Sequence, residues 1–250
     1  MTDQASAAVL IIGDEILSGR TKDANLSCIA LKLAGIGIEV IEVRIVSDDE
    51  AAIVDAVNAL RRTYTYVFTT GGIGPTHDDI TADSIAKAFG VPIDVRADAL
   101  AILEAHYATG ELNEARKRMA RIPDGAELID NPVSKAPGFR LENVHVLAGI
   151  PLLVEVMMDG LLEKLSGGKL LHTHTISAYI AESHVATGLG QIQRDFPEVR
   201  IGSYPFLRGG KSGASLVMRS TNDAALASVC ELVREVIRAT GEEIQADVAS

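Results

Sequence analysis

Short apolar runs alternate with amphipathic stretches along the first two thirds of the chain. Runs with the length and β-branched content of strands lie at residues 7–12, 39–46 and 64–69. Apolar side chains at helical spacing lie at residues 25–33, 51–62 and 79–90. Gly90 is placed to end the last of these helices. This alternation predicts an α/β fold of three layers, in which helices cover both faces of a mostly parallel sheet.

The remaining sequence predicts further elements and a second domain. Residues 95–121 predict one or two helices broken near Gly110, a strand follows at 143–147, and a helix at 152–165. Beyond them, strands at 169–180, 199–204 and 214–219 and helices at 182–196 and 223–240 predict a small α+β unit. We therefore expect two domains, residues 1–168 and residues 169–250.

Three polar motifs follow the first three predicted strands: Gly13-Asp14-Glu15, Ser47-Asp48-Asp49, and the glycine-rich run Thr69–Thr81. Ser47, with Glu50 three residues on, also matches a capping box that would start the helix at 51–62. Functional groups of parallel sheets collect at the carboxyl ends of the strands. The three motifs are therefore predicted to converge on one edge and to form an acidic, glycine-lined pocket.

The glycine-rich run joins the third strand to a helix. Gly71, Gly72 and Gly74 allow positive φ and a close approach of backbone N–H groups to an anion at a helix start. Asp78 and Asp79 lie beside that position and would repel a phosphate unless a divalent cation such as Mg²⁺ lay between them. The run therefore indicates phosphate and metal. Turn-forming glycines and an acidic helix start explain it equally well without a ligand, and it matches neither the P-loop nor the dinucleotide fingerprint.

Composition and charge narrow the classes of protein. With 47% apolar residues the chain can bury a substantial core, and its two cysteines, Cys28 and Cys230, suggest neither a disulfide framework nor a zinc site. The apolar run after the amino terminus is too short for an export signal or a membrane span. These features favour the cytoplasm. The net charge is −11, about −10 of it before Lys169, so no segment has a basic surplus and nucleic acid is not expected as a partner.

Several cationic residues allow more than one interpretation. The cluster Arg116, Lys117, Arg118 and Arg121 fits a solvated helix face better than a phosphate contact. His172 and His174 share one face of a predicted strand, but no third metal ligand lies near them in the sequence. Surface or packing roles are therefore favoured for these two histidines.

Four ordered motifs carry a resemblance to a known family. Gly13–Asn25, Val46–Asp49, Thr69–Thr81 and Asn131–Gly138 resemble the MoaB/Mog molybdopterin-binding domain, in the variant found in competence/damage-inducible protein A and at the amino terminus of eukaryotic FAD synthases. The resemblance covers about residues 8–165. The order of elements in the second domain resembles the small KH-like domain of the same proteins, although no Gly-x-x-Gly lies between two of its helices and RNA binding is disfavoured.

The resemblance implies a set of site residues. The catalytic set comprises Asp48, His77, Asp78 and Asp79, and the metal set Asp14, Asp78 and Asp79. The ligand and phosphate set comprises Gly13, Asp14, Glu15, Asn25, Thr70, Gly71, Gly72, Gly74, Pro75, Thr76, Lys135, Pro137 and Gly138. His77 is either a donor or acid toward phosphate or a loop residue, and Lys135 either closes over the ligand or is an exposed loop lysine.

One segment departs from the family pattern. Many relatives carry an acid two residues after the proline that starts the last helix of the domain, where this chain has Leu153 after Pro151. Glu155 lies four residues after that proline, about half a turn further round the helix, so it does not simply replace the missing acid. The resemblance therefore does not extend to a metal or ligand contact made by that acid.

Three functions remain open. The first is a metal-dependent pyrophosphatase that uses Mg²⁺, Mn²⁺ or Co²⁺, with or without a monovalent cation, to hydrolyse a nucleotide diphosphate such as ADP-ribose or FAD. The second is molybdopterin binding in cofactor synthesis, and the third is a non-catalytic nucleotide-binding module. All three predict a small phosphorylated nucleotide or pterin as partner, and the resemblance implies a homo-oligomer. Neither the deamidase nor the nucleotide-transferring domain of the larger relatives is present in this sequence.

Overall fold

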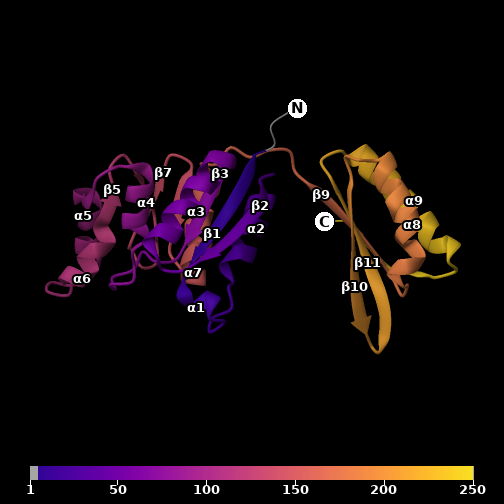
Figure 1. Cartoon of the computed structure of the whole chain (residues 1–250), viewed down its shortest axis with the longest axis horizontal. Coiled ribbons are helices and arrows are strands. Elements are labelled where there is room, and N and C mark those ends of the chain that lie inside the picture. The colour runs from indigo at the N-terminus through magenta and orange to yellow at the C-terminus, as the bar shows by residue number, and fades with distance from the viewer. Residues whose placement is uncertain (1–4, 250) are drawn as a thin grey trace. The chain divides into compact units, whose positions relative to one another are not determined.

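The structure is a computed structural model that describes residues 5–249. The chain divides after Gly168 into two compact units, and each is described by itself (Figure 1). The strands of the first unit are β1 (Ser6–Ile12), β2 (Glu39–Val46), β3 (Tyr66–Thr70), β4 (Ile93–Val95), β5 (Arg121–Pro123), β6 (Glu127–Ile129), β7 (Gly138–Leu141) and β8 (Val144–Leu147). Its helices are α1 (Asp14–Leu17), α2 (Asn25–Ala34), α3 (Glu50–Thr63), α4 (Thr81–Phe89), α5 (Ala97–His106), α6 (Glu114–Lys117), the 3₁₀ turn η1 (Arg118–Ala120) and α7 (Pro151–Leu162).

The first unit is built on a six-stranded sheet of order β2-β1-β3-β8-β7-β6. Strands β2, β1, β3 and β8 pair in parallel, and the β8-β7 and β7-β6 pairs are antiparallel. Alternate residues of β1 point to opposite faces: Leu10 packs in the core cluster that includes residues of α3 and α4, and Val9 in the cluster that includes residues of α2 and α7. The prediction of a mostly parallel sheet covered on both faces is therefore confirmed.

The start of α3 differs from the prediction. The N-cap is Asp49, whose side chain accepts a hydrogen bond from the Ala52 N–H at 2.9 Å. Glu50, expected to close a capping box, forms an ion pair with Lys87. The prediction of Ser47 as N-cap was wrong, because a carboxylate two residues later competes for the same orphan N–H groups.

The second unit is a four-stranded antiparallel sheet with two helices. Its elements are β9 (His172–Ala178), α8 (Glu182–Asp195), β10 (Arg200–Arg208), β11 (Lys211–Ser220), α9 (Asp223–Ala239) and β12 (Ile244–Ala249), with strand order β10-β11-β9-β12. Both helices lie on the same face of the sheet (Figure 1), where Leu216, Val185 and Val233 belong to one buried cluster. Within residues 169–249, no helix covers the other face of this sheet. A small α+β unit is confirmed, with β12 as an additional strand.

Candidate functional site

A cavity of about 550 Å³ opens at the carboxyl ends of the parallel strands of the first unit. Four segments that follow β1, β2, β3 and β8 contribute to its lining, together with residues of η1 and of the loops around α5 and β7. The lining residues are Ile12, Gly13, Glu15, Asp48, Gly71, Gly72, Ile73, Gly74, Pro75, Asp78, Asp79, Tyr107, Met119, Asn131, Ser134, Ala136, Ala148, Gly149, Ile150, Pro151 and Leu153. The predicted convergence of the three strand-end motifs is thus confirmed.

The glycine loop is held in a conformation that only glycine supports well. Gly71 and Gly72 have φ of 100° and 67°, and a Cβ on Gly71 would lie 2.2 Å from the Ile12 carbonyl oxygen. Thr81, at the first turn of α4, fixes the loop: its N–H donates to the Gly72 carbonyl at 3.0 Å and its hydroxyl to the Gly71 carbonyl at 2.9 Å. The loop is therefore pinned against β1 and α4.

Three backbone donors of this loop are free. Among the described residues no acceptor pairs with the N–H groups of Gly72, Ile73 or Gly74. These N–H groups belong to residues that line the cavity. An anion in the cavity could accept hydrogen bonds from them, as phosphates do at other glycine loops that precede a helix.

Carboxylates from different strand ends surround Asp48. The Asp14 N–H donates to Asp48 Oδ2 at 2.9 Å, which links the motifs after β1 and β2. Burial raises the pKa of the Asp48 carboxyl above its usual range, and the negative charges of Asp14, Glu15 and Asp78 raise it further, against the hydrogen bond from Asp14. The Asp48 carboxyl is therefore partly buried and has three acidic neighbours.

Asp78 and Asp79, which follow the glycine loop, make different contacts. Asp79 Oδ2 accepts hydrogen bonds from the Thr76 N–H at 2.8 Å and the Thr76 hydroxyl at 2.5 Å, so this carboxylate also shapes the turn. Asp78 has a pKa below its usual range, chiefly because of a hydrogen bond from Thr76 and one from its own backbone. The His77 side chain is 99% exposed, 3.9 Å from Asp78, and does not line the cavity.

Other predicted residues lie around the cavity in different ways. Asn25 is buried and donates from Nδ2 to the Gly149 carbonyl at 2.8 Å, while its Oδ1 has no described partner. Thr70 is buried at the end of β3, and its hydroxyl also lacks a described partner. Both residues line a smaller space of about 70 Å³ that shares Glu15, Gly71 and Gly149 with the main cavity. The smaller space therefore adjoins the main cavity.

The loop before β7 reaches the cavity through residues on either side of Lys135. Lys135 has φ of 60° and does not line the cavity, whereas its neighbours Ser134 and Ala136 do. A Cβ on Gly138 would lie 2.3 Å from the Val146 carbonyl oxygen and 2.5 Å from Met157 Cε. Gly138 is therefore required by packing between β7, β8 and α7.

The α7 wall of the cavity is apolar where many relatives have an acid. Leu153 is 8% exposed and lines the cavity. Glu155 is exposed and close enough to Cys28 and Lys32 of α2 to influence their pKa values. Glu155 therefore does not take the place of the missing acid.

Several lining residues carry no motif and were not predicted. Tyr107, after α5, and Met119, in η1, add an aromatic ring and a thioether, and Ile150 adds an apolar side chain that is 61% exposed. The Arg116 guanidinium lies over the Tyr107 ring at 4.3 Å. The periodicity of residues 95–121 gave helices but no indication that this segment reaches the strand ends.

The basic cluster of this segment is mostly engaged. Arg121 makes a two-armed ion pair with Asp83 of α4, at 2.9 and 2.6 Å. Arg118 and Arg121 both line a space of about 20 Å³ together with Gly72, Gly74 and Asp79, and the Arg118 Nε is buried without a described partner. These two arginines thus lie next to the glycine loop, in contrast to the solvated role predicted for the cluster.

The donor set suits a hard divalent cation bound together with a phosphate. Among residues 5–249, no three His, Cys, Asp or Glu side chains are placed to hold a metal ion by themselves. Mg²⁺, however, is commonly held by one or two carboxylates together with substrate phosphates. Asp48 and Asp78 offer such oxygen donors beside the free N–H groups, and a cation would offset the repulsion among the carboxylates around Asp48. The predicted metal set of Asp14, Asp78 and Asp79 stays a prediction.

A parallel α/β sheet with an acidic, glycine-lined cavity at its strand ends defines a class of small-molecule-binding domain. Residues 8–167 match the family described as "Probable molybdopterin binding domain", and residues 170–243 match "FAD synthase, middle domain". The chain belongs to the molybdopterin-binding-domain family, which confirms the resemblance carried by its motifs. Within residues 5–249, no helix is long and apolar enough to cross a membrane.

Relatives extend the similarity over most of the chain. A protein of Aeropyrum pernix is 31% identical over 97% of this chain and 96% of its own length. A CinA-like protein of Geobacter metallireducens is 32% identical over 97% of this chain, which spans 63% of that protein. The crystal structure of the protein CinA from Thermoplasma acidophilum is 32% identical, with a TM-score of 0.61, and covers 65% of this chain and 99% of the solved one.

Proposed function

We propose that the first unit binds a phosphorylated nucleotide or pterin together with a divalent cation and hydrolyses a nucleotide diphosphate such as ADP-ribose or FAD. One observation carries the proposal. The cavity presents three free backbone donors on the glycine loop, yet its acidic side chains, Glu15, Asp48, Asp78 and Asp79, are accompanied by no Lys, Arg or His among the lining residues. A divalent cation between a phosphate and these carboxylates would offset their repulsion.

The remaining lining residues fit a ligand with a flat ring. Tyr107, Met119, Ile150 and Leu153 present an aromatic ring, a thioether and two aliphatic side chains. A volume of about 550 Å³ lies in the range of small-molecule and cofactor sites. A base or pterin ring on the apolar side chains and its phosphates on the glycine loop would use both kinds of lining.

The chain's own groups support hydrolysis in a defined way. The N–H groups of Gly72, Ile73 and Gly74 would bind the phosphate oxygens and stabilise the negative charge that develops as water adds to phosphorus and the bridging P–O bond breaks. Asp48 and Asp78 would hold the cation, and Asp79 would keep the turn in shape through Thr76. The bound cation would supply polarisation of the diphosphate and a water of lowered pKa.

The test compares two adjacent substitutions. The full chain is incubated with ADP-ribose or FAD and Mg²⁺, Mn²⁺ or Co²⁺, and products are separated by ion-exchange chromatography. We expect AMP among the products, none in EDTA, and a loss on the order of 100-fold for Asp48→Asn. The matched control is Asp49→Asn, because asparagine caps helices as well as aspartate does and α3 should keep its N-cap.

Two outcomes would count against the proposal. Full activity of the Asp48→Asn variant would show that hydrolysis does not depend on the carboxylate cluster. Saturable binding of molybdopterin or ADP-ribose with no product under any of the three metals would retain the binding site and reject hydrolysis, in favour of a molybdopterin-binding or non-catalytic role. Binding is measured by isothermal titration calorimetry on the same protein.

A further inference from the structure

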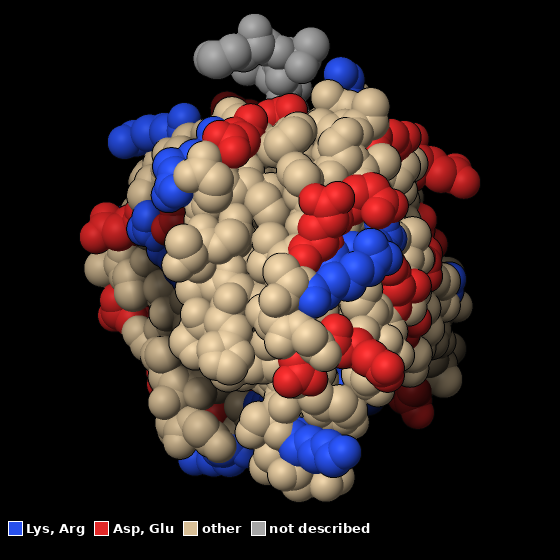
Figure 2. All heavy atoms as spheres, turned by 90° about the vertical axis from the view of Figure 1, so that its right-hand side faces the viewer, with Lys and Arg blue, Asp and Glu red and all other residues tan. Residues whose placement is uncertain are grey.

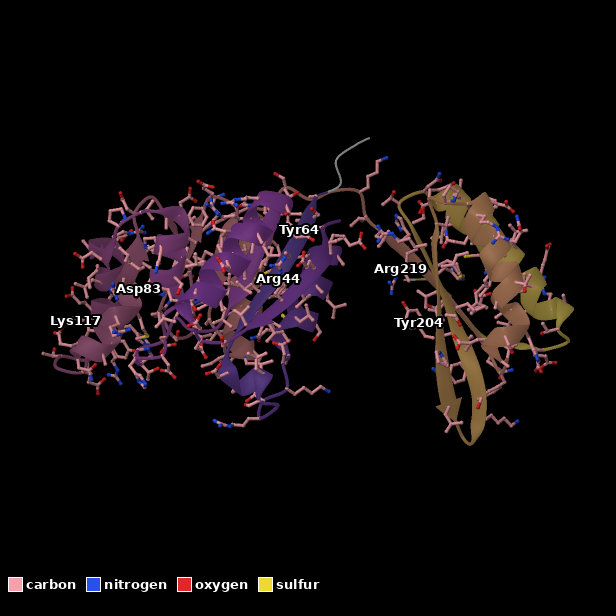
Figure 3. The ribbon with its side chains drawn as sticks, in the orientation of Figure 1. Arg44, Tyr64, Asp83, Lys117, Tyr204 and Arg219 are labelled. Carbon is pink, nitrogen blue, oxygen red and sulfur yellow. The ribbon has the colours of Figure 1, made fainter. Side chains whose placement is uncertain are left out.

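The uncovered face of the second sheet can be assigned from strand pairing. In β10 and β11, Arg200 pairs with Arg219, Tyr204 with Ser215, and Arg208 with Lys211. The intervening residues Leu216 and Met218 of β11 are buried in the core beneath the helices. Residues at the alternate positions therefore point to the opposite face. Figure 3 labels Tyr204 and Arg219, which lie on the side of the sheet away from α8 and α9. We call this surface the open face.

Aromatic rings are spread across the open face. Tyr204 is 49% exposed, and a Cβ on Gly202 would lie 2.9 to 3.2 Å from atoms of its ring, so the ring rests on the glycine backbone. Phe206 lies in the same way over Gly213, whose Cβ would approach its ring at 2.4 Å. The Phe206 ring also contacts that of Tyr179, with ring centres 5.8 Å apart. Tyr204 is the exposed ring of the three, whereas Tyr179 and Phe206 are half-buried.

Part of the positive charge of the second unit is gathered on the open face. The unit has eight Lys and Arg residues and nine Asp and Glu residues. The open-face positions of β10 and β11 hold four exposed cations, Arg200, Arg208, Lys211 and Arg219, and no acid. The surface of α8 and α9 instead carries acidic and basic side chains together (Figure 2). The net charge of the second unit does not show that cations gather on one face of its sheet.

The cations are placed in a way that favours an anionic ligand. Arg208 and Lys211 are directly opposite each other, and like charges at such positions destabilise a sheet. Arg208 lies over the Phe206 ring at 4.4 Å and Lys211 near the Tyr179 ring at 5.7 Å. On β10 the rings of Tyr204 and Phe206 thus lie between Arg200 and Arg208, which are about 26 Å apart at the usual rise per residue.

We propose that the open face binds single-stranded nucleic acid, independently of the function of the first unit. Exposed rings on a four-stranded sheet stack unpaired bases, and flanking cations neutralise the phosphates between them. An acidic protein would satisfy the cations but would leave the ring of Tyr204 without a flat partner. A strand of nucleotides matches both the charge and the aromatic surface.

The test uses the full chain and a 12-nucleotide RNA of mixed sequence with a 5′ fluorescein label, together with the matching DNA strand and its duplex. Fluorescence anisotropy is measured at several KCl concentrations from 50 to 200 mM. We expect saturable binding of the single strands, weaker binding of the duplex, and about tenfold weaker binding by Tyr204→Ala. Lys211→Glu should also weaken binding and lower the salt slope by about 0.7 for each phosphate that the variant no longer neutralises.

The controls separate this proposal from others. Arg238→Glu makes a comparable charge change at an exposed position on α9 and should leave binding unchanged. Lys211→Glu places opposite charges across the hairpin, so its thermal midpoint should be equal to or above that of the parent protein. Equal weakening by Arg238→Glu, unchanged binding by Tyr204→Ala, or no binding at 50 mM KCl would overturn the proposal. A lower sedimentation mass of Tyr204→Ala, without nucleic acid binding by the parent, would assign the face to a second copy.

Discussion

The two units treat buried polar atoms in opposite ways. In the first unit, five buried side-chain atoms have no described partner, and they belong to Asn25, Thr69, Thr70, Arg118 and His145. Among residues 169–249 no such atom is found. There, the hydroxyl groups of Ser177 and Ser215 pair at 2.8 Å, and Asp247 accepts two hydrogen bonds from Arg234.

The number of unpaired buried polar atoms differs between the units in the same way as the place of their candidate functions. Buried polar groups are nearly always paired in folded proteins, and exceptions concentrate at functional or strained places. Asn25, Thr70 and Arg118 all line spaces that adjoin the glycine loop. The second unit carries its candidate ligand surface on an open sheet face, which leaves its interior free to satisfy every polar group described. The first unit should therefore be the more sensitive of the two to changes in its interior.

The largest expected effect of this difference concerns His145 and pH. Its ring is stacked on Phe68 with centres 4.9 Å apart, and burial, helped by the charge of Arg140, lowers the pKa of the imidazole to about 4. Above pH 7 the imidazole is neutral in both folded and unfolded chains. As the pH falls from about 6.5 toward 4, only the unfolded chain takes up the proton, and His145 costs the fold about 3 kcal/mol.

Urea unfolding from pH 7.5 to 4 would measure this effect. As the pH falls, the free energy of unfolding of the His145→Phe variant should rise relative to that of the parent protein, because phenylalanine has no proton to bind. The control is His77→Phe at a side chain that is 99% exposed, where the difference should stay constant. A constant difference for His145→Phe as well would contradict a buried neutral imidazole.

The next effect tests the close contact at the glycine loop. Gly71→Ala should cost about 2 kcal/mol more than Gly110→Ala, because both positions have positive φ but only the first would bring a Cβ to 2.2 Å from a carbonyl oxygen. Thermal unfolding of the two variants gives the difference directly. Equal costs would mean that the loop can move away from Ile12, and that its conformation is not imposed by β1.

How far the sequence predicts the site depends on whether a residue belongs to a strand-end motif. Asp14 and Asp48 are 34 residues apart, yet their contact follows from parallel strands ending at one edge. Tyr107 and Met119 could not be found in this way, because their place depends on how the segment between β4 and β5 packs beside the loop. β12 also went unpredicted, since this edge strand follows a strong amphipathic helix and its burial pattern is mostly exposed.

The smallest expected effect lies in the second unit, where the polar groups are paired. Hydrogen bonds from Arg234 and His174 lower the pKa of the Asp247 carboxyl to about 2, so its contribution to stability is present above about pH 4 and is lost as the pH falls through 2. Asp247 is partly exposed, and solvent screening reduces that contribution to about 1 kcal/mol. Asp247→Asn should lower the free energy of unfolding by that amount at pH 7. Glu231→Gln, which alters a more exposed partner of the same arginine, should change it by less than about 0.5 kcal/mol. Equal losses from both variants would show that burial of the ion pair does not decide its strength, and the contrast between the two interiors would then rest on the first unit alone.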